Sequence, residues 1–445
     1  VLNFMKKIYI KTYGCQMNVY DSERMYELMQ PHGYTPTNYY DDADLIILNT
    51  CHIREKAAEK IYSELGRIAP HKIHLKNQGK KLNIVVAGCV AQAEGKEIIR
   101  RQPMVDIVVG PQTYHRLPEI LNNHFKNPKR IVDTDFPIEN KFDELQKLRN
   151  NKNPVAFLSI QEGCDKFCSF CVVPYTRGAE YSRPVKEIIL EAKNLIKQGA
   201  KEICLLGQNV NAYHGEYKHK TLALDKLIFE IANLEGIKRI RYMTSHPADM
   251  TEGLINAHGE IKALMPNLHL PVQSGDDKVL KSMNRKYTSS EYLKIIEKLR
   301  DARPDIVFSS DIIIGFPGET DQAFKNTLDL VEKVNYSQAY SFKYSRRPGT
   351  PGSIMKGQVA ESIKSERLLR LQEILYSQQL YFNRAFIGKN MDILIERRKK
   401  NNQLVGRSPY MQAVHLLEDN CEIGDILNIK VFDADKNSLK GEVVQ

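Results

Sequence analysis

Two groups of three cysteines are the residues of this 445-residue chain best suited to chemistry. Cys164, Cys168 and Cys171 share the short segment E-G-C-D-K-F-C-S-F-C. Three thiolates on one short loop can hold three irons of a cubane iron–sulfur cluster, which leaves the fourth iron open to an exchangeable molecule. A structural zinc site normally has four ligands, and no fourth Cys or His stands at finger-like spacing. The segment therefore predicts an open iron–sulfur site.

The second group of cysteines is dispersed. Cys15, Cys51 and Cys89 each follow an apolar, strand-like run, namely I-Y-I-K-T-Y-G, L-I-I-L-N-T and I-V-V-A-G. Because the carboxyl ends of parallel strands meet at one edge of a sheet, we expect the three thiols to converge. Helix N-termini after them would help to stabilise thiolates. The spacing predicts a second cluster site.

Cys204 and Cys421 lack such partners, and we expect both to be structural. Eight cysteines are too few for a secreted disulfide scaffold, so metal binding or catalysis is the better interpretation. With 42% hydrophobic and 27% charged residues the chain is neither disordered nor collagenous. No apolar run approaches the ~20 residues of a membrane helix, and no secretory signal is readable, so we expect a cytoplasmic protein without a membrane partner.

Short apolar runs alternate with amphipathic stretches over residues 1–125, which indicates an N-terminal α/β domain with a parallel sheet. A polar linker is expected over residues 126–154. The alternation returns over 155–350, where six strands and the helices between them predict a parallel sheet curled into a partial (β/α)6 barrel. Within it, Gly199 is expected to end a helix, and Thr288 and Glu291 form a capping box.

A connecting helix is predicted within residues 351–387, and a small antiparallel β-barrel over 388–445. The net charge of +10 makes a polyanionic partner plausible. Arg397, Arg398, Lys399 and Lys400 form a basic run in a hairpin of this barrel, and phosphate contact is the favoured interpretation over a solvated tip.

The clustered cysteines resemble the hallmark of the radical S-adenosylmethionine (SAM) superfamily, and Phe170 fits the superfamily's usual aromatic residue between the last two cysteines. The resemblance implies that the open iron chelates SAM, whose reductive cleavage gives a 5′-deoxyadenosyl radical. It also implies that Gly207 and Gln208 lie near the SAM amino group and Gly315 near its adenine; strand-ending turns are the alternative for all three.

The whole chain resembles the methylthiotransferase family within that superfamily. The resemblance rests on Y-G-C-Q-M-N, N-T-C-H-I-R-E-K-A, G-C-V-A-Q and G-C-D-K-F-C-S-F-C-V-V-P-Y-T-R-G, although His52 stands where Ser is usual. It implies two 4Fe–4S clusters, two SAM molecules used per reaction, and a C-terminal TRAM domain that binds RNA. The N-terminal cluster would carry the sulfur, and the radical made at the barrel cluster would activate the substrate carbon.

The motifs V-V-P-Y-T-R-G, L-L-G-Q-N-V-N-A-Y, G-P-Q-T-Y-H-R-L-P and T-S-H-P are similar to those of bacterial members that methylthiolate C2 of isopentenyladenosine in tRNA, just 3′ of the anticodon. The resemblance therefore implies tRNA and SAM as partners, with a sulfur donor, an electron donor such as a flavodoxin or ferredoxin, and a monomeric enzyme. Threonylcarbamoyl-adenosine in tRNA or a ribosomal-protein aspartate is the alternative substrate. A non-catalytic iron–sulfur RNA-binding protein is the alternative of another class.

Several further side chains have two interpretations. Arg177 and Arg183 either contact substrate phosphate or the N-terminal domain, or are ordinary surface arginines. His246 and His269 lie at strand ends on the presumed active face of the partial barrel, and we expect a hydrogen-bonded structural role in preference to catalysis. The candidates for base stacking are Tyr175, Tyr213 and Tyr410.

Overall fold

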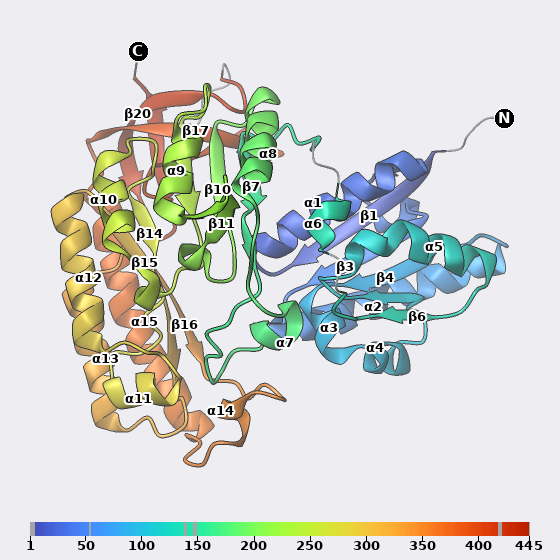
Figure 1. The fold of residues 1–445 in the computed structure, drawn as a ribbon, viewed down its shortest axis with the longest axis horizontal. Coiled ribbons are helices and arrows are strands. Elements are labelled where there is room, and N and C mark those ends of the chain that lie inside the picture. Colours follow the sequence, from blue (N-terminus) through green and yellow to red (C-terminus); the bar gives the residue numbers. More distant parts are fainter. Residues whose placement is uncertain (1–4, 53–54, 138–139, 146–148, 417–420, 445) are drawn as a thin grey trace. The chain divides into compact units, whose positions relative to one another are not determined.

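The computed structural model describes residues 5–52, 55–137, 140–145, 149–416 and 421–444. They form two compact units (Figure 1). The N-terminal unit contains residues 1–149, 162–165 and 171–181, and the C-terminal unit contains the remainder. The chain therefore passes between the units five times, after residues 149, 161, 165, 170 and 181.

The N-terminal unit is built on a six-stranded sheet in which every neighbouring pair is parallel. The spatial order is β2-β1-β3-β4-β5-β6. Its strands are β1 (Lys6–Tyr13), β2 (Tyr34–Pro36), β3 (Leu45–Thr50), β4 (Asn83–Ala87), β5 (Ile107–Val109) and β6 (Ile131–Asp133). All residues of β3 and β4 are buried, as expected for central strands of a parallel sheet that is covered on both faces.

The helices of this unit alternate with the strands and are α1 (Gln16–Met29), α2 (Glu55–Asn77), α3 (Cys89–Glu94), α4 (Lys96–Arg101), α5 (Leu117–Lys126) and α6 (Lys141–Glu144). The side chains of Ile61, Leu65 and Ile68 recur on one face of α2 and join the core over β3 and β4. The α/β character predicted for this region is therefore confirmed.

The segment 126–154 holds more structure than a polar linker would. Its three-residue strand β6 completes the sheet, and α6 brings Lys141 into the interior of the N-terminal unit. A strand of three residues among polar neighbours gives almost no periodic signal. Ile53 and Arg54, where a helical stretch was predicted to begin, and residues 418–420, where a turn was predicted, lie outside the described residues.

The C-terminal unit contains the predicted curled sheet as two parallel three-stranded sheets, in the orders β13-β10-β7 and β14-β15-β16. The strands are β7 (Val155–Ser159), β10 (Glu202–Leu206), β13 (Arg239–Tyr242), β14 (Asn267–His269), β15 (Val307–Ile314) and β16 (Gln338–Lys343). A parallel bridge between Ile240 and Leu264 links the halves. The short strands β8 (Gln161–Glu162) and β9 (Tyr181–Ser182) pair with each other, and β11 (His214–Tyr217) forms a hairpin with β12 (Lys220–Ala223).

Helices pack their apolar faces against this sheet (Figure 1), namely α8 (Val185–Lys197), α9 (Leu224–Ala232), α10 (Glu252–Glu260), α12 (Ser289–Ala302), α13 (Asp321–Val334) and α15 (Glu361–Arg384). The shorter helices α11 (Asp277–Ser282) and α14 (Pro351–Ile354) also belong to this unit, whereas α7 (Val173–Arg177) belongs to the N-terminal unit. The capping box of Thr288 and Glu291 begins α12 as predicted. Gly199 follows the end of α8 with φ +111°, also as predicted.

The last five strands close into the predicted small barrel, with the order β17-β18-β19-β21-β20. They are β17 (Asn390–Arg398), β18 (Leu404–Arg407), β19 (Ala413–Leu416), β20 (Ile426–Ala434) and β21 (Ser438–Val443). Every pair is antiparallel except β19 with β21, which is parallel. Arg239 of the large sheet donates to the carbonyl oxygens of Arg407 and Asp392, both at 2.8 Å, so this barrel is docked and not merely tethered.

Among the described residues, no helix is both long enough and apolar enough to cross a membrane.

Candidate functional site

The three dispersed cysteines lie at the carboxyl ends of three neighbouring strands. Cys15 follows β1, Cys51 follows β3, and Cys89 follows β4 and begins α3. Because Tyr13 is in register with Thr50, the backbone N–H of Cys51 donates to the Tyr13 carbonyl at 2.8 Å. The structure therefore brings these three cysteines together, as their positions after apolar runs predicted.

Two glycines permit the close approach of the loops that carry these thiols. A Cβ atom on Gly14 would lie 2.3 Å from the Cβ of Cys51, and Gly14 has φ +137°. A Cβ on Gly88, with φ +89°, would lie 2.3 Å from Asn49 Oδ1 and 2.8 Å from the Thr50 carbonyl oxygen. Both positions therefore require glycine for space and for backbone conformation.

The surroundings of the three thiols favour at least one thiolate. A hydrogen bond from Cys51 lowers the pKa of Cys15 to about 6. Burial raises the pKa of Cys89, and the Arg177 guanidinium, which hydrogen-bonds to its sulfur, opposes that effect. Cys51 and Cys89 are buried whereas Cys15 is exposed.

Arg177 belongs to a buried network of four charged side chains within the N-terminal unit. Its Nη2 donates to Asp21 Oδ2 at 2.6 Å, and its Nη1 pairs with Glu162. Lys141 Nζ donates to Glu162 Oε1 at 2.7 Å and to the Pro111 carbonyl at 2.9 Å. All four side chains are less than 5% exposed, so the interpretation of Arg177 as a surface arginine is wrong. Two cations balance two carboxylates beside the cysteine cluster.

This donor set fits an iron–sulfur cluster better than a single metal ion. Within the described part of the chain, no three His, Cys, Asp or Glu side chains are close enough together to bind one ion. In a cubane cluster each cysteine binds a different iron, so the sulfurs stand farther apart than the ligands of one ion. Three strand-end thiols that share one sheet edge meet that requirement.

The clustered cysteines occupy the loop where the chain passes between the units. Cys164 and Cys171 belong to the N-terminal unit, where the backbone N–H of Cys164 donates to the Gly178 carbonyl at 3.2 Å and that of Val173 donates to Cys171 Sγ at 3.4 Å. A Cβ on Gly163 would lie 1.9 Å from the Ala179 carbonyl oxygen. Glycine is therefore required just before the first of these cysteines.

Cys168 belongs to the C-terminal unit and is buried there. Arg285 Nη1 donates to its sulfur at 3.5 Å, and Nη2 of the same guanidinium donates to the Pro271 carbonyl at 2.8 Å. Asn284 Nδ2 holds the Phe167 carbonyl at 3.0 Å, where Phe167 has φ +48°. These contacts position the middle cysteine, and no motif in the sequence analysis singled out Arg285.

The predicted SAM-binding glycines end strands in ordered turns. Gln161 Oε1 accepts from the backbone N–H groups of Gln208 at 2.8 Å and Asn209 at 3.1 Å, and a Cβ on Gly207 would lie 2.5 Å from that oxygen. Gly315 has φ +73°, its N–H donates to Glu319 Oε1 at 2.9 Å, and Lys364 packs over it. Both turns lie at carboxyl ends of strands, where parallel sheets bind ligands.

Buried polar atoms without a partner gather at the same sheet edge. Ser159 ends β7, Asn209 follows β10, and Ser245 and His246 follow β13; their unpaired atoms are Oγ, Oδ1, Oγ and Nε2 respectively. Buried polar groups are normally hydrogen-bonded, so four such atoms fit a polar cofactor such as SAM. Burial lowers the pKa of His246 to about 2, and its Nδ1 accepts from the Ala248 N–H, so Nε2 carries the proton.

Several candidates from the sequence have structural roles. Arg183 is buried, with Nη1 on the Ser159 carbonyl at 2.5 Å, so it is not a surface arginine either. Tyr213 is buried and donates to the Arg183 carbonyl at 2.8 Å, which removes it from base stacking. Cys204 is buried in β10, where burial raises its pKa to about 11 and Arg241 donates to its sulfur at 2.9 Å. The structural role predicted for Cys204 is therefore confirmed.

Other candidates remain accessible. Tyr175 is 49% exposed, whereas Tyr410 donates to Asp305 Oδ2 at 3.3 Å. Cys421 lies beside the core of the C-terminal barrel. The basic run in the β17–β18 hairpin is exposed throughout, and it comprises Arg397, Arg398, Lys399 and Lys400.

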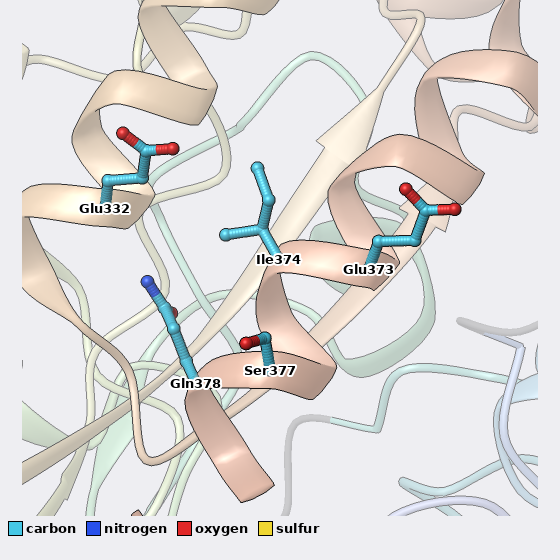
Figure 2. A pocket seen from close by; sticks show the side chains of 5 residues that line it. All are labelled: Glu332, Glu373, Ile374, Ser377 and Gln378. Atoms are coloured by element: carbon cyan, nitrogen blue, oxygen red, sulfur yellow. The ribbon is translucent and has the colours of Figure 1, made fainter. Parts of the chain in front are cut away.

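A surface pocket between α13 and α15 lies apart from all these residues in the sequence. It is lined by Glu332, Glu373, Ile374, Ser377 and Gln378 (Figure 2). Its two carboxylates belong to different helices and no thiol, imidazole or cation lines it.

Comparison with known proteins agrees with this architecture. Residues 7–110 match the uncharacterized protein family UPF0004, residues 158–331 the radical SAM superfamily and residues 384–444 the TRAM domain. Two radical S-adenosylmethionine enzymes of known structure share the fold. One is the methyltransferase TsrM of Kitasatospora setae, solved with a tryptophan substrate; its TM-score is 0.58 at 12% identity, and the match covers 78% of this chain and 75% of TsrM. The other is OxsB, with a TM-score of 0.54 at 13% identity, and the match covers 84% of this chain and 56% of OxsB.

The fold and the cysteine loop define a radical SAM enzyme that carries a TRAM domain. Proteins named tRNA-2-methylthio-N(6)-dimethylallyladenosine synthase are 57% identical in the Wolbachia of Brugia malayi (99% of this chain, 100% of that protein), 56% in Rickettsia felis (99% and 100%) and 53% in Agrobacterium fabrum (98% and 97%). The chain belongs to this family. Its recognition as a tRNA-modifying radical SAM enzyme that uses SAM and iron–sulfur chemistry is thereby confirmed.

Proposed function

We propose that this chain adds a methylthio group to C2 of N6-dimethylallyladenosine in tRNA, with its two cysteine groups dividing the work. Cys15, Cys51 and Cys89 hold one 4Fe–4S cluster, and Cys164, Cys168 and Cys171 hold a second. The single observation that carries this proposal is the convergence of the first three at one sheet edge, beside Arg177. An enzyme that only generated a radical would need one cluster site.

When bound, the cluster at the second site and SAM supply a carbon-centred radical able to remove an unactivated hydrogen atom. The chain's own residues orient and shield these groups. Arg285 fixes Cys168, and Gln161 shapes the turn that carries Gly207 and Gln208. The neutral His246 keeps a buried Nε2–H without a partner, which is a hydrogen-bond donor for a polar cofactor.

The exposed basic run is proposed to contact RNA phosphates. Arg398 Nη2 donates to the Cys421 carbonyl at 3.0 Å, which fixes this end of the hairpin, and Lys399 Nζ donates to a neutral partner, Gln403 Oε1, at 3.0 Å. A TRAM domain with an exposed basic tip suits a polyanion. We further propose a monomeric cytoplasmic enzyme, with a flavodoxin or ferredoxin as electron donor and a separate sulfur donor.

Iron and sulfide analysis after anaerobic reconstitution tests the division of work. The unsubstituted chain should bind about eight irons, and each triple Cys→Ala variant should bind about four. A Cys204→Ala variant is the matched control and should retain about eight, because its thiol is sequestered by Arg241. Four irons in the unsubstituted chain would contradict the two-cluster proposal.

Methylthiolation is measured by nucleoside mass spectrometry on tRNA with and without the isopentenyl group. Product only with the isopentenylated tRNA supports the proposed substrate. Product on a threonylcarbamoyl-adenosine tRNA or on a ribosomal protein would support the alternative methylthiotransferase reactions. RNA binding without 5′-deoxyadenosine under reducing conditions would indicate the non-catalytic alternative.

A further inference from the structure

The inner face of the sheet β14-β15-β16 carries four polar or aromatic side chains that the proposed chemistry does not use. Leu268, Phe308 and Ile312 point to the helices and join the main core. Because side chains alternate along a strand, their neighbours face the other side. Those neighbours are His269 on β14, Ser309 and Asp311 on β15, and Tyr340 on β16.

The strand register places these four side chains in one patch, which we call the inner patch. His269 is in register with Ser309, and Asp311 with Tyr340. His269 Nδ1 lies 3.0 Å from Ser309 Oγ, and its Nε2 lies 3.6 Å from Asp311 Oδ2. The Tyr340 ring meets the His269 ring edge-on at 6.3 Å. His269 therefore links the other three.

The inner patch combines two held residues with two accessible ones. His269 and Ser309 are buried, at 7% and 6% exposure, whereas the Asp311 side chain is 34% exposed and Tyr340 is 40% exposed. The expected structural role of His269 agrees with this arrangement. It supports a carboxylate and an aromatic ring that are both partly exposed.

The Asp311 carboxylate has unused acceptor capacity. In the described ranges its one basic partner is the His269 imidazole, and their 3.6 Å separation is beyond the usual length of an N–H···O hydrogen bond. A carboxylate offers about four acceptor positions and no donor when ionised. Half-buried carboxylates are costly unless hydrogen-bonded, so the arrangement favours a ligand that brings an N–H or O–H donor.

We propose that Asp311 accepts the N6–H of the substrate adenosine and that Tyr340 contacts the face of its base. This inference rests on the proposed function, because N6-dimethylallyladenine has a single N–H donor and otherwise presents acceptors. An acceptor-only carboxylate can therefore bind the base only through N6. Aromatic side chains are the usual contacts for an unstacked RNA base. Asp311 stands four residues before Gly315, the residue expected near the SAM adenine. Four strand residues span about 13 Å, and this distance separates the role of Asp311 from cofactor binding.

This contact is tested in the reconstituted holoenzyme by a double-change cycle, in which the unsubstituted enzyme and an Asp311 variant are each assayed on two RNAs. The probes are two synthetic anticodon stem-loop RNAs, one with N6-isopentenyladenosine and one with N6-methyl-N6-isopentenyladenosine, which lacks the N6–H. The unsubstituted enzyme should have a kcat/KM about 10- to 100-fold lower on the second RNA, because the loss of one hydrogen bond to a charged group usually lowers binding by about this factor. Asp311→Ala should show the same low kcat/KM on both RNAs.

Two further variants keep the test decisive. Asp311→Asn retains an acceptor of similar shape, and it is used in place of Asp311→Ala if the alanine variant binds less iron. The ratio of its kcat/KM values on the two RNAs should be smaller than that of the unsubstituted enzyme. Ser341→Ala, on the opposite face of β16, is the matched control and should discriminate as the unsubstituted enzyme does. RNA-independent cleavage of SAM to 5′-deoxyadenosine should be the same in all variants.

Equal discrimination by the unsubstituted enzyme and both Asp311 variants would overturn the inference, since the N6–H would then not be read by this carboxylate. A parallel loss of SAM cleavage and SAM binding in Asp311→Asn would also overturn it and assign the residue to the cofactor. Either result leaves the proposed function intact when the unsubstituted enzyme methylthiolates the first RNA. Absence of product from the unsubstituted enzyme would instead contradict the proposed function itself.

Discussion

Arg177 Nη2 lies 2.6 Å from Asp21 Oδ2, across 156 residues of sequence. Both side chains are nearly inaccessible to solvent, and the same guanidinium pairs with Glu162 and hydrogen-bonds to Cys89. The first helix of the N-terminal unit is thereby fixed to the segment that follows the clustered cysteines. One buried cation serves two carboxylates and one thiol.

Arg177→Gln should lower the free energy of unfolding of the apoprotein by about 3–5 kcal/mol, because it leaves Asp21 and Glu162 with an uncompensated buried charge. The matched control is Arg100→Gln, which breaks an exposed pair with Glu97 and should leave the free energy of unfolding nearly unchanged. Urea unfolding followed by circular dichroism measures both. Similar losses in the two variants would contradict the importance of the network.

Gly14→Ala should remove the N-terminal cluster without unfolding the chain. Its Cβ would lie 2.3 Å from that of Cys51, so the two cysteine-bearing loops must separate. We expect iron to fall from about eight to about four per chain. Gly33→Ala is the matched control, since Gly33 also has positive φ but nothing lies within 4 Å of its Cβ position. It should cost about 1–2 kcal/mol of stability and retain the iron; equal iron loss in both would indicate general misfolding.

The parts of the site that the sequence predicted are those marked by local pattern. Cys51 follows the mainly apolar run L-I-I-L-N-T, so its place at a strand end was readable, and the loop of Cys164 is defined by spacing alone. The partners of these cysteines were not readable. Arg177 carries no local sign that Asp21 will bury it, and Lys141 lies in a polar stretch that predicted a linker.

The inner patch illustrates the same limit for strands. His269 and Asp311 are separated by two helices in sequence, and their proximity follows from the register of β14 with β15, which no single-strand pattern specifies. The short apolar runs did predict the strands themselves. They could not predict that one face of the sheet would bring a carboxylate, an imidazole and an aromatic ring together.

Histidine 258 should make the stability of the C-terminal unit pH-dependent. Burial lowers the pKa of His258 to about 3, and its Nε2 is hydrogen-bonded to Tyr242 Oη at 2.7 Å. The unfolded chain binds a proton below pH ~6.5 whereas the folded chain does not, so stability is complete above that pH and falls as the pH is lowered towards 3. The apoprotein should lose about 1 kcal/mol from this residue between pH 7 and pH 5.5.

His258→Leu isolates this contribution. Its free energy of unfolding should be lower than that of the unsubstituted chain at pH 7, because Tyr242 loses its partner, but the decline from pH 7 to pH 5.5 should be about 1 kcal/mol smaller. Urea titrations at the two pH values give both quantities. An unchanged difference between the two pH values would show that His258 is protonated alike in the folded and unfolded chains.

Removing positive charge from the β17–β18 hairpin should weaken RNA binding in a salt-dependent way. Lys399 is exposed and its side-chain partner Gln403 is neutral, so its charge is available to a phosphate, and Lys400 follows it in the turn. For the double variant Lys399→Gln/Lys400→Gln, the slope of log affinity against log salt concentration should fall in magnitude by about 1.4–1.8. Lys440→Gln is the matched control, because Asp433 Oδ2 already neutralises Lys440 at 2.7 Å.

Filter binding of the isopentenylated stem-loop RNA over a salt series measures the slopes, and kcat at saturating RNA should be unchanged. A slope equal to that of the Lys440 variant would place the phosphate contacts elsewhere on the chain.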